Sequence, residues 1–260
     1  MPQGHDPEDY RLYRSQRAAM TAILRHVSRD GYTWHLSTKT PTDRVLKAVR
    51  ILDQKHAVLA APWERQIRRA AGKPLAHLVL APEPKGGAWP YVLLGTRKLK
   101  GEAMRRIDDP RRPLTWWAYR EKTGWTPFYR LVLHPTTGTY TWEVVPEVFE
   151  EYLNKVVAAA AGEDWPALAR TLKSFYVLPQ FRGVNEQAKR LFKTASRIWG
   201  NRYLRTPEGT SMPPPFREVS PPPTARGAGI RLYVTEEEAR GGRPRTLGEA
   251  LRGLLEEETP

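Results

Sequence analysis

Aromatic side chains are concentrated in one segment, residues 114–142, which contains Trp116, Trp117, Tyr119, Trp125, Phe128, Tyr129, Tyr140 and Trp142. Arg120 and Arg130 lie among them. Successive residues of a strand point to opposite faces, so we expect Trp116 on one face and Trp117 and Tyr119 on the other. An exposed aromatic face beside arginines can stack unpaired bases and neutralise their phosphates. The alternative is that one face belongs to the core and that helices cover the other.

The chain just before this segment is basic. Acidic residues are present at Glu102, Asp108 and Asp109, but the basic residues outnumber them and comprise Arg97, Lys98, Lys100, Arg105, Arg106, Arg111 and Arg112. A long, basic connection between strands is suited to contact with a phosphate backbone. The alternative is a solvated loop with an internal ion pair between Arg106 and Asp109.

A predicted helix over residues 184–199 carries a third basic cluster. Val184, Ala188, Leu191, Ala195 and Ile198 form an apolar stripe at helical spacing. The basic residues of the opposite side and of the exit from the helix are Lys189, Arg190, Lys193, Arg197 and Arg202, whereas the acidic residue nearby is Glu186. Such a helix is suited to a major groove or to a track of phosphates. A solvated face and an anionic membrane surface are the alternatives.

A short motif near the C-terminal end adds a further basic candidate. The run Arg240-Gly-Gly-Arg-Pro-Arg245 resembles the AT-hook, a minor-groove-binding peptide built around Gly-Arg-Pro with basic neighbours. The resemblance implies that Arg243 and Arg245 reach into a narrow, electronegative minor groove. The alternative is a Gly-Gly helix terminator followed by a proline that opens the next helix.

Motifs for catalysis and for cofactors are scarce. The absence of cysteine excludes disulfides and Cys-ligated zinc, and no phosphate-binding GxxxxGK[ST] loop is present. The sequence therefore favours a binding protein over an enzyme, with no cofactor and no metal. The rival hypothesis is a metal-dependent phosphodiesterase or nuclease that draws carboxylates from Asp53, Glu83, Asp108 and Glu143.

The hydrophobic periodicity predicts an α+β fold, in which an antiparallel β-meander over about residues 75–146 is flanked by N-terminal and C-terminal helices. The strand candidates are residues 75–80, 89–96, 114–121, 128–134 and 139–145, with a hairpin turn at 135–138. Residues 32–37 alternate and suggest one further short strand. In the last part we expect helices over 147–161, 165–176 and 184–199, the last of them stopped by Gly200.

A Pro-rich stretch at residues 206–229 predicts a linker between a body, residues 1–205, and a small tail with short helices, residues 230–260. The charge divides at the same place. The body carries a net charge of +16 and the stretch after it a net charge of −2, within a whole-chain charge of +14. In the tail, Thr246 and Glu249 have the spacing of a capping box.

A strongly basic body predicts a polyanionic partner, nucleic acid first. No apolar run is long enough to span a membrane and no secretory signal is recognised, so we expect a cytoplasmic protein without a membrane partner. The sequence thus predicts a nucleic-acid-binding protein, DNA ahead of RNA, acting by phosphate contacts and aromatic stacking within a replication, transfer or processing assembly. A third hypothesis is a protein–protein scaffold that recruits other members of a nucleoprotein complex through residues 206–260.

Overall fold

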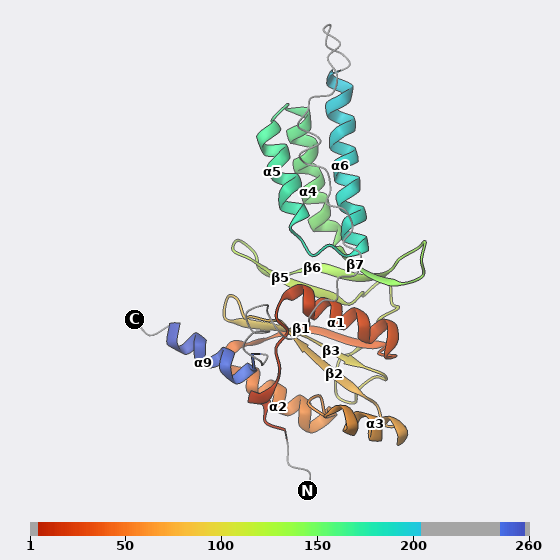
Figure 1. The fold of residues 1–260 in the computed structure, drawn as a ribbon, viewed down its shortest axis with the longest axis vertical. Helices are drawn as coiled ribbons and strands as arrows, with labels where there is room; N and C mark the ends of the chain where they lie inside the picture. The colour runs from red at the N-terminus through yellow and green to blue at the C-terminus, as the bar shows by residue number, and fades with distance from the viewer. Residues whose placement is uncertain (1–4, 204–244, 258–260) are drawn as a thin grey trace, which may run out of the picture. The chain divides into compact units, whose positions relative to one another are not determined.

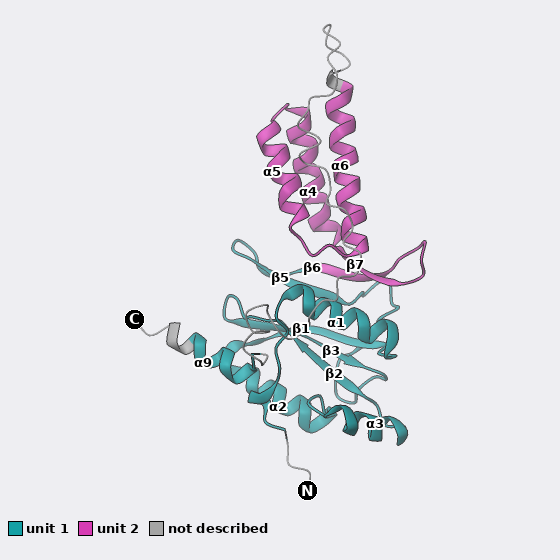
Figure 2. Cartoon of the chain, viewed as in Figure 1, with its two compact units in different colours: residues 1–127, 229–260 teal, residues 128–228 magenta. Residues whose placement is uncertain are grey.

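The computed structural model of the chain describes residues 5–203 and 245–257. It forms two compact units (Figure 2): unit 1 comprises Met1–Pro127 and Gly229–Pro260, and unit 2 comprises Phe128–Ala228. The predicted linker at residues 206–229 lies outside the described residues. The predicted body of residues 1–205 therefore includes parts of both units, and the boundary between them falls within one strand.

The described elements follow the order that Figure 1 shows. Those of unit 1 are η1 (Pro7–Asp9), α1 (Gln16–Arg29), β1 (Trp34–Pro41), η2 (Thr42–Arg44), α2 (Val45–His56), α3 (Pro62–Ala70), β2 (Ala76–Leu80), β3 (Ala88–Gly95), β4 (Arg105–Arg106), β5 (Thr115–Arg120) and α9 (Leu247–Glu257). Strand β6 (Gly124–Leu133) contains the boundary, and unit 2 continues with β7 (Tyr140–Val144), α4 (Pro146–Ala161), α5 (Trp165–Tyr176) and α6 (Arg182–Tyr203).

The α+β class and the antiparallel pairing are confirmed, with helices before and after the strands. The strands form two sheets instead of one continuous meander. The first has the order β2-β3-β1-β4 and the second the order β5-β6-β7. Strand β1 pairs with β3 along its whole length, from Trp34 opposite Gly95 to Pro41 opposite Ala88. The short strand suggested by alternation at residues 32–37 is thus an inner strand of the first sheet.

The core of unit 1 lies between this sheet and the helices packed on it. Helix α1 lies beside β2 (Figure 1) and buries Ala19, Ile23 and Val27 at helical spacing. Every residue of β2 is buried, and Leu93 of β3 is fully covered. A strand buried on both faces is expected to be mostly apolar, and β2 is apolar apart from His77.

The C-terminal helix α9 is grouped with unit 1. The Leu12 N–H donates to the Arg245 carbonyl at 3.0 Å, and the Leu247 N–H donates to the Tyr10 carbonyl at 2.8 Å. Leu247 is fully buried. The predicted capping box is present, because Thr246 Oγ1 accepts from the Glu249 N–H and Glu249 accepts from the Thr246 N–H.

Unit 2 combines the β6–β7 hairpin with three helices that lie side by side (Figure 1). The predicted turn at 135–138 is confirmed: the His134 N–H donates to the Thr139 carbonyl, and Gly138 has a φ of +61°.

Helix α6 continues through Gly200 to Tyr203, so the helix end predicted at Gly200 is wrong. A glycine inside a helix costs only about 1 kcal/mol relative to alanine, and the burial of Trp199 and the turns before it offset that cost. Among the described residues, no helix is long and apolar enough to cross a membrane.

Candidate nucleic-acid interface

A cleft with a volume of about 350 Å³ opens on unit 1. We call it the aromatic cleft. It is lined by Arg14, Ser15, Gln16, Ala81, Pro82, Glu83, Lys85, Trp116, Trp117, Ala118, Tyr119 and Trp125. These residues come from the start of α1, the β2–β3 connection, strand β5 and the start of β6. All of these segments belong to unit 1.

A tight turn at the tip of the β2–β3 connection shapes one wall of the aromatic cleft. Lys85 and Ala88 exchange backbone hydrogen bonds of 3.1 and 3.2 Å. The two residues between them, Gly86 and Gly87, have φ values of +54° and +69°. Positive φ at both central residues defines the hairpin turn that glycine adopts most easily. The turn is fastened to the opposite wall because the Trp125 indole N–H donates to the Lys85 carbonyl at 2.6 Å.

Tyr119 packs directly on this turn. A Cβ placed on Gly86 would lie 2.3 Å from Cε2 of Tyr119, so the ring occupies the space that any other residue would fill. The Tyr119 and Trp125 rings meet edge to face, with centroids 5.7 Å apart and planes at 67°. Tyr119 nevertheless remains 38% exposed. The result is a partly exposed aromatic surface whose position is fixed by packing against the backbone.

Trp117 lies on the same face of β5 and has a cation beside it. The Lys39 ammonium, from β1, lies 5.7 Å from the centre of the Trp117 ring, within the range of a cation–π contact. The Trp117 indole N–H has no hydrogen-bond partner among the described residues. Trp117 and Tyr119 both line the cleft, as do the residues Trp116 and Ala118.

The start of α1 contributes polar and basic residues to the aromatic cleft. Ser15 caps the helix by accepting from the Ala18 N–H at 3.2 Å. The first turn of α1 contains no acidic residue, and Arg14 precedes the cap. Among the cleft-lining residues the one acid is Glu83, set against the bases Arg14 and Lys85.

Trp116, which the sequence also suggested for stacking, lines the cleft but is almost fully buried. Its side chain points to the other face of β5 and is 2% exposed. The large apolar ring is covered because that face of the strand forms part of the core, as the alternative interpretation of alternating aromatics held. Trp142 of β7 is likewise fully buried.

In the connection between β3 and β5, the basic side chains are exposed and several apolar side chains are buried. Three apolar residues, Leu99, Met104 and Ile107, anchor it in the core. The exposed basic side chains are Arg97, Lys98, Lys100, Arg105, Arg106, Arg111 and Arg112. Arg106 forms its ion pair with Asp108, with Nε 2.8 Å from Oδ1, whereas the sequence suggested Asp109. Asp109 instead accepts from the Arg111 N–H at 3.0 Å.

Two of the arginines predicted to bind nucleic acid lie on strands β5 and β6, and their side chains have different surroundings. Arg120 is half-buried at the end of β5. Arg130 lies opposite Glu143 in the β6–β7 register and pairs with it, with Nε 2.6 Å from Oε1. A cross-strand pair of opposite charges stabilises the hairpin. The Arg130 guanidinium thus has a carboxylate partner in this structure, and its contact with phosphate stays a prediction.

Helix α6 presents a basic side in unit 2. The predicted apolar stripe is buried at Val184, Ala188, Leu191 and Ala195. The exposed cations Lys189, Lys193 and Arg197, which we call the α6 ridge, recur at every fourth residue. None of the three forms an ion pair within the described part of the chain. The neighbouring Arg190 is also exposed, and its guanidinium lies 5.3 Å from the centre of the Phe149 ring.

Three further predicted residues lie at or beyond the limits of the described chain. Arg202 belongs to the last turn of α6. Arg243, the central arginine of the AT-hook-like motif, lies outside the described residues. Arg245 is exposed just before α9, and its carbonyl accepts the Leu12 N–H.

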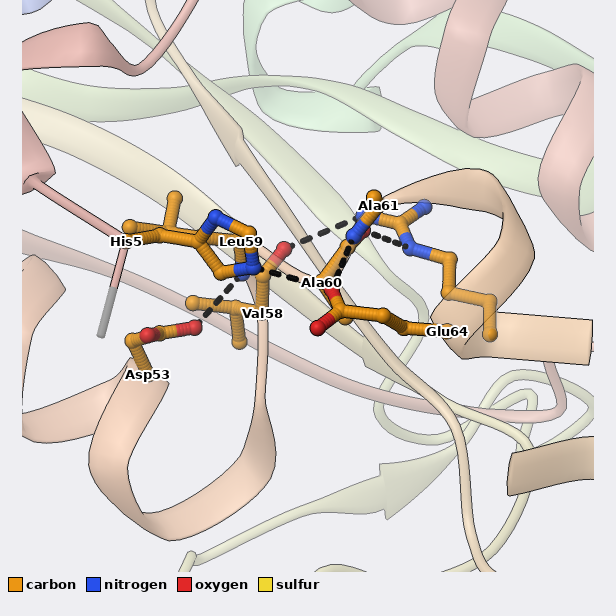
Figure 3. A network of polar contacts seen from close by, with 8 residues as sticks. His5, Asp53, Val58, Leu59, Ala60, Ala61 and Glu64 are labelled. Atoms are coloured by element: carbon orange, nitrogen blue, oxygen red, sulfur yellow. Dashed lines mark hydrogen bonds and ion pairs between the residues drawn. The ribbon is translucent and has the colours of Figure 1, made fainter. Parts of the chain in front are cut away.

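Three carboxylates of the rival nuclease hypothesis have partners of their own in the structure. Asp53 accepts from the Leu59 N–H at 2.8 Å (Figure 3), Asp108 pairs with Arg106, and Glu143 pairs with Arg130 in unit 2. Within residues 5–203 and 245–257, no group of three His, Asp or Glu side chains is placed to hold a metal ion.

One buried histidine, His77, and one half-buried histidine, His26, form part of the internal support of unit 1. Arg65 donates to Nδ1 of His77 at 2.9 Å, so the neutral ring carries its proton on Nε2, which lies 3.2 Å from the Tyr13 hydroxyl. Complete burial, with His26 and Arg65 nearby, holds the pKa of His77 well below its usual value. Burial also lowers the pKa of His26. The hydrogen bond that His26 donates to Asp30 acts in the opposite direction and raises this pKa.

His35 of β1 is a separate buried histidine, 4% exposed. Burial lowers its pKa to about 4, with the Arg105 charge adding to the effect. Such a ring is neutral at physiological pH and does not contribute to the positive surface.

Sequence reasoning missed several residues that the fold brings to the aromatic cleft, namely Arg14, Gln16, Lys39 and Lys85. The Gly86-Gly87 pair is the signal that could have located the wall, because two glycines between strand candidates predict a two-residue hairpin turn. Trp125 was recognised as part of the aromatic cluster but not as a binding residue.

Comparisons with models of protein families, with curated proteins and with solved structures find no match to this chain.

Proposed function

We propose that the protein binds single-stranded nucleic acid, DNA ahead of RNA, with the aromatic cleft of unit 1 as the place where bases stack. The observation that carries the proposal is the joint presence of Trp117, Tyr119 and Trp125 in one cleft beside Arg14 and Lys85. Proteins that hold single strands without reading their sequence combine the same two elements, aromatic platforms for bases and cations for phosphates.

The geometry supports an unpaired ligand over a duplex. Bases within a duplex are stacked on each other, so their faces reach a protein ring only after the base leaves the stack. Tyr119 offers a partly exposed ring fixed by Gly86 and Trp125. A base that enters the cleft therefore meets a preorganised surface, which lowers the entropy cost of binding.

Phosphate contacts supply the second part of the proposed interaction. Residues 1–127 carry 24 Lys or Arg and 12 Asp or Glu, so most of the positive charge of the body lies in unit 1. The exposed bases of the β3–β5 connection and the α6 ridge extend the set of cations. Contacts of this kind are independent of base identity. They weaken as the salt concentration rises, because the release of counterions from the nucleic acid on binding then becomes less favourable.

The proposal is tested with a fluorescein-labelled oligothymidylate and the full chain, by fluorescence anisotropy. Replacing Tyr119 by Ala removes one ring, so Kd should rise roughly 5- to 150-fold, the equivalent of about 1–3 kcal/mol per stacked base. Trp117→Ala should have an effect in the same range. Labelled oligouridylate and a labelled duplex of the same length compare RNA and paired DNA under the same conditions.

A matched variant controls for the loss of a tryptophan as such. Trp63 lies on α3, away from the residues that line the aromatic cleft, and is 62% exposed. Trp63→Ala should leave the affinity for oligothymidylate unchanged. If the Tyr119→Ala and Trp117→Ala variants bind like the wild-type protein, or if the duplex binds more tightly than the single strand, the proposal is wrong.

A further inference from the structure

Glu83 is the one acid among the residues that line the aromatic cleft. Its side chain is exposed, and it forms no hydrogen bond or ion pair within the described residues. Arg14 and Lys85 line the same cleft, so the cleft attracts a phosphate, but this one carboxylate repels it. A carboxylate at this place is suited to a part of a nucleotide that donates hydrogen bonds.

The backbone around Glu83 has little conformational freedom. Glu83 lies between Pro82 and Pro84, whose rings fix their own φ angles and favour an extended conformation for the residue before Pro84. The segment is tied down before the prolines, because the Trp89 indole N–H donates to the Ala81 carbonyl at 2.7 Å. After the prolines it enters the hairpin turn that shapes the wall of the cleft. A preorganised backbone thus carries the carboxylate, which lowers the entropy cost of a contact with a ligand.

Two hydrogen-bond donors of the aromatic cleft lack an acceptor among the described residues. They are the Trp117 indole nitrogen and the Gln16 side-chain nitrogen, both covered from solvent. A covered donor without an acceptor is unfavourable. Both side chains are only partly buried, so a small rotation can bring either nitrogen to a ligand. The cleft therefore combines a carboxylate that can accept hydrogen bonds with donors that can be satisfied by an acceptor of the ligand.

The bases of DNA differ in how they present donors to a carboxylate. Guanine carries its N1–H and its 2-amino group side by side, so both oxygens of one carboxylate can accept a hydrogen bond. In adenine and cytosine the amino group lies next to a ring nitrogen that is an acceptor, and in thymine the N3–H lies between two carbonyl oxygens. These acceptors repel the second carboxylate oxygen. The O6 of guanine is at the same time an acceptor for the donor of Trp117 or Gln16.

We propose that the aromatic cleft selects guanine among unpaired bases, with Glu83 accepting hydrogen bonds from N1–H and the 2-amino group while the base stacks on Tyr119. The inference rests on the proposed function, because a base must first enter the cleft. It adds a sequence preference to stacking and phosphate contacts, which are themselves independent of base identity. Glu83 is then the residue that determines specificity, and the aromatic rings supply affinity.

The test compares short fluorescein-labelled oligothymidylates that differ in one central nucleotide, by fluorescence anisotropy with the full chain. With guanine at that position the Kd should be roughly 5- to 150-fold lower than with thymine, adenine or cytosine, the range for one bidentate contact between a side chain and a base. Hypoxanthine, which lacks the 2-amino group, should lose most of this preference. Glu83→Gln should bind the guanine strand like the thymine strand, while its Kd for unmodified oligothymidylate should not rise.

Glu121→Gln is the matched control, because Glu121 is an exposed acid of unit 1 that does not line the aromatic cleft. It removes the same charge and should keep the full preference for guanine.

The outcomes separate this inference from the proposed function. If neither strand binds, or if binding does not depend on Tyr119 and Trp117, the proposed function fails and the guanine contact fails with it. If oligothymidylate binds through these rings but guanine gives no lower Kd, or if Glu83→Gln keeps the guanine preference, the inference about Glu83 alone is overturned. A preference that disappears in EDTA would show that Glu83 acts through a divalent cation and would equally overturn it.

Discussion

Replacing Gly86 by Ala perturbs the aromatic cleft through a single methyl group. The new Cβ would lie 2.3 Å from Cε2 and 2.9 Å from Cζ of Tyr119. Carbon atoms in favourable contact are about 3.5–4.0 Å apart, so the ring must retreat by about 1 Å or more. Because Tyr119 is 38% exposed, it can turn toward solvent without unfolding the strand. The substitution should therefore displace the ring that we assign to base stacking.

The backbone adds a second effect that can be separated from the first. Gly86 has a φ of +54°, and an alanine in the left-handed region costs about 1–2 kcal/mol. The neighbouring Gly87 has a φ of +69°, but a Cβ there would meet nothing within 4 Å. Gly87→Ala is thus a matched control, which has the backbone strain without the collision.

The two variants are compared by urea unfolding and by anisotropy with labelled oligothymidylate. Both should lose about 1–2 kcal/mol of unfolding free energy. Gly86→Ala should also lose roughly 5- to 150-fold in affinity, the range for one base–aromatic stack, while Gly87→Ala should bind like the wild-type protein. Equal affinities of the two variants would refute the argument that the Tyr119 position controls binding.

Three more predictions follow from the structure. Replacing all three cations of the α6 ridge by Ala should reduce the slope of log K against log salt by about 2 for a single strand; an unchanged slope in the anisotropy titration would remove the ridge from the interface. Because the folded pKa of His35 is lowered to about 4, its contribution to stability is complete above the unfolded value of about 6.5 and declines as pH falls toward about 4, a loss of up to roughly 3 kcal/mol. Urea unfolding at about pH 7.5 and about pH 4.5 measures this loss, which His35→Leu should reduce; identical acid sensitivity in that variant would contradict it. Arg65→Met should lower the unfolding free energy by about 2–4 kcal/mol because the hydrogen bonds from its guanidinium to the Ala60 and Val58 carbonyls and to His77 are lost, whereas the exposed Arg69→Met should stay within about 0.5 kcal/mol, and equal losses in urea unfolding would show that the Arg65 contacts do not hold α3.

Local patterns predicted the parts of the fold whose contacts are close in sequence. The apolar stripe of α6, the β6–β7 turn and the capping box at Thr246 all appear in the structure, because each depends on residues within a turn or two of each other. The length of α6 was missed because tertiary packing around Trp199 overrides the weak preference of Gly200 for a helix end.

Long-range pairing was not predictable from one sequence. Nothing local in residues 34–41 indicates that β1 inserts beside β3, which follows it by many residues. The same limit applies to α9, whose contacts with Tyr10 and Leu12 join the two ends of the described chain. Alternation placed Trp116 and Trp117 on different faces of β5, but it gave no means of deciding that Trp116 is the buried one of the two.

In the candidate site too, local features could be predicted from the sequence and long-range contacts could not. The basic and aromatic character of the interface was visible in the sequence, whereas the partners that shape it were not. Lys39 reaches Trp117 from another strand, and Lys85 is joined to Trp125 across a hairpin turn. These contacts depend on how the first sheet and the β5–β6 hairpin approach each other within unit 1.

The central claim is that unpaired bases stack in the aromatic cleft, and photocrosslinking tests it most directly. A single-stranded oligonucleotide containing 5-iododeoxyuridine is irradiated with the full chain, and the crosslinked residues are identified by mass spectrometry. We predict crosslinks to Tyr119, Trp117 or Trp125, which Gly86→Ala should diminish and Gly87→Ala should not. Crosslinks confined to aromatic residues outside the cleft, such as Trp63, would contradict the account.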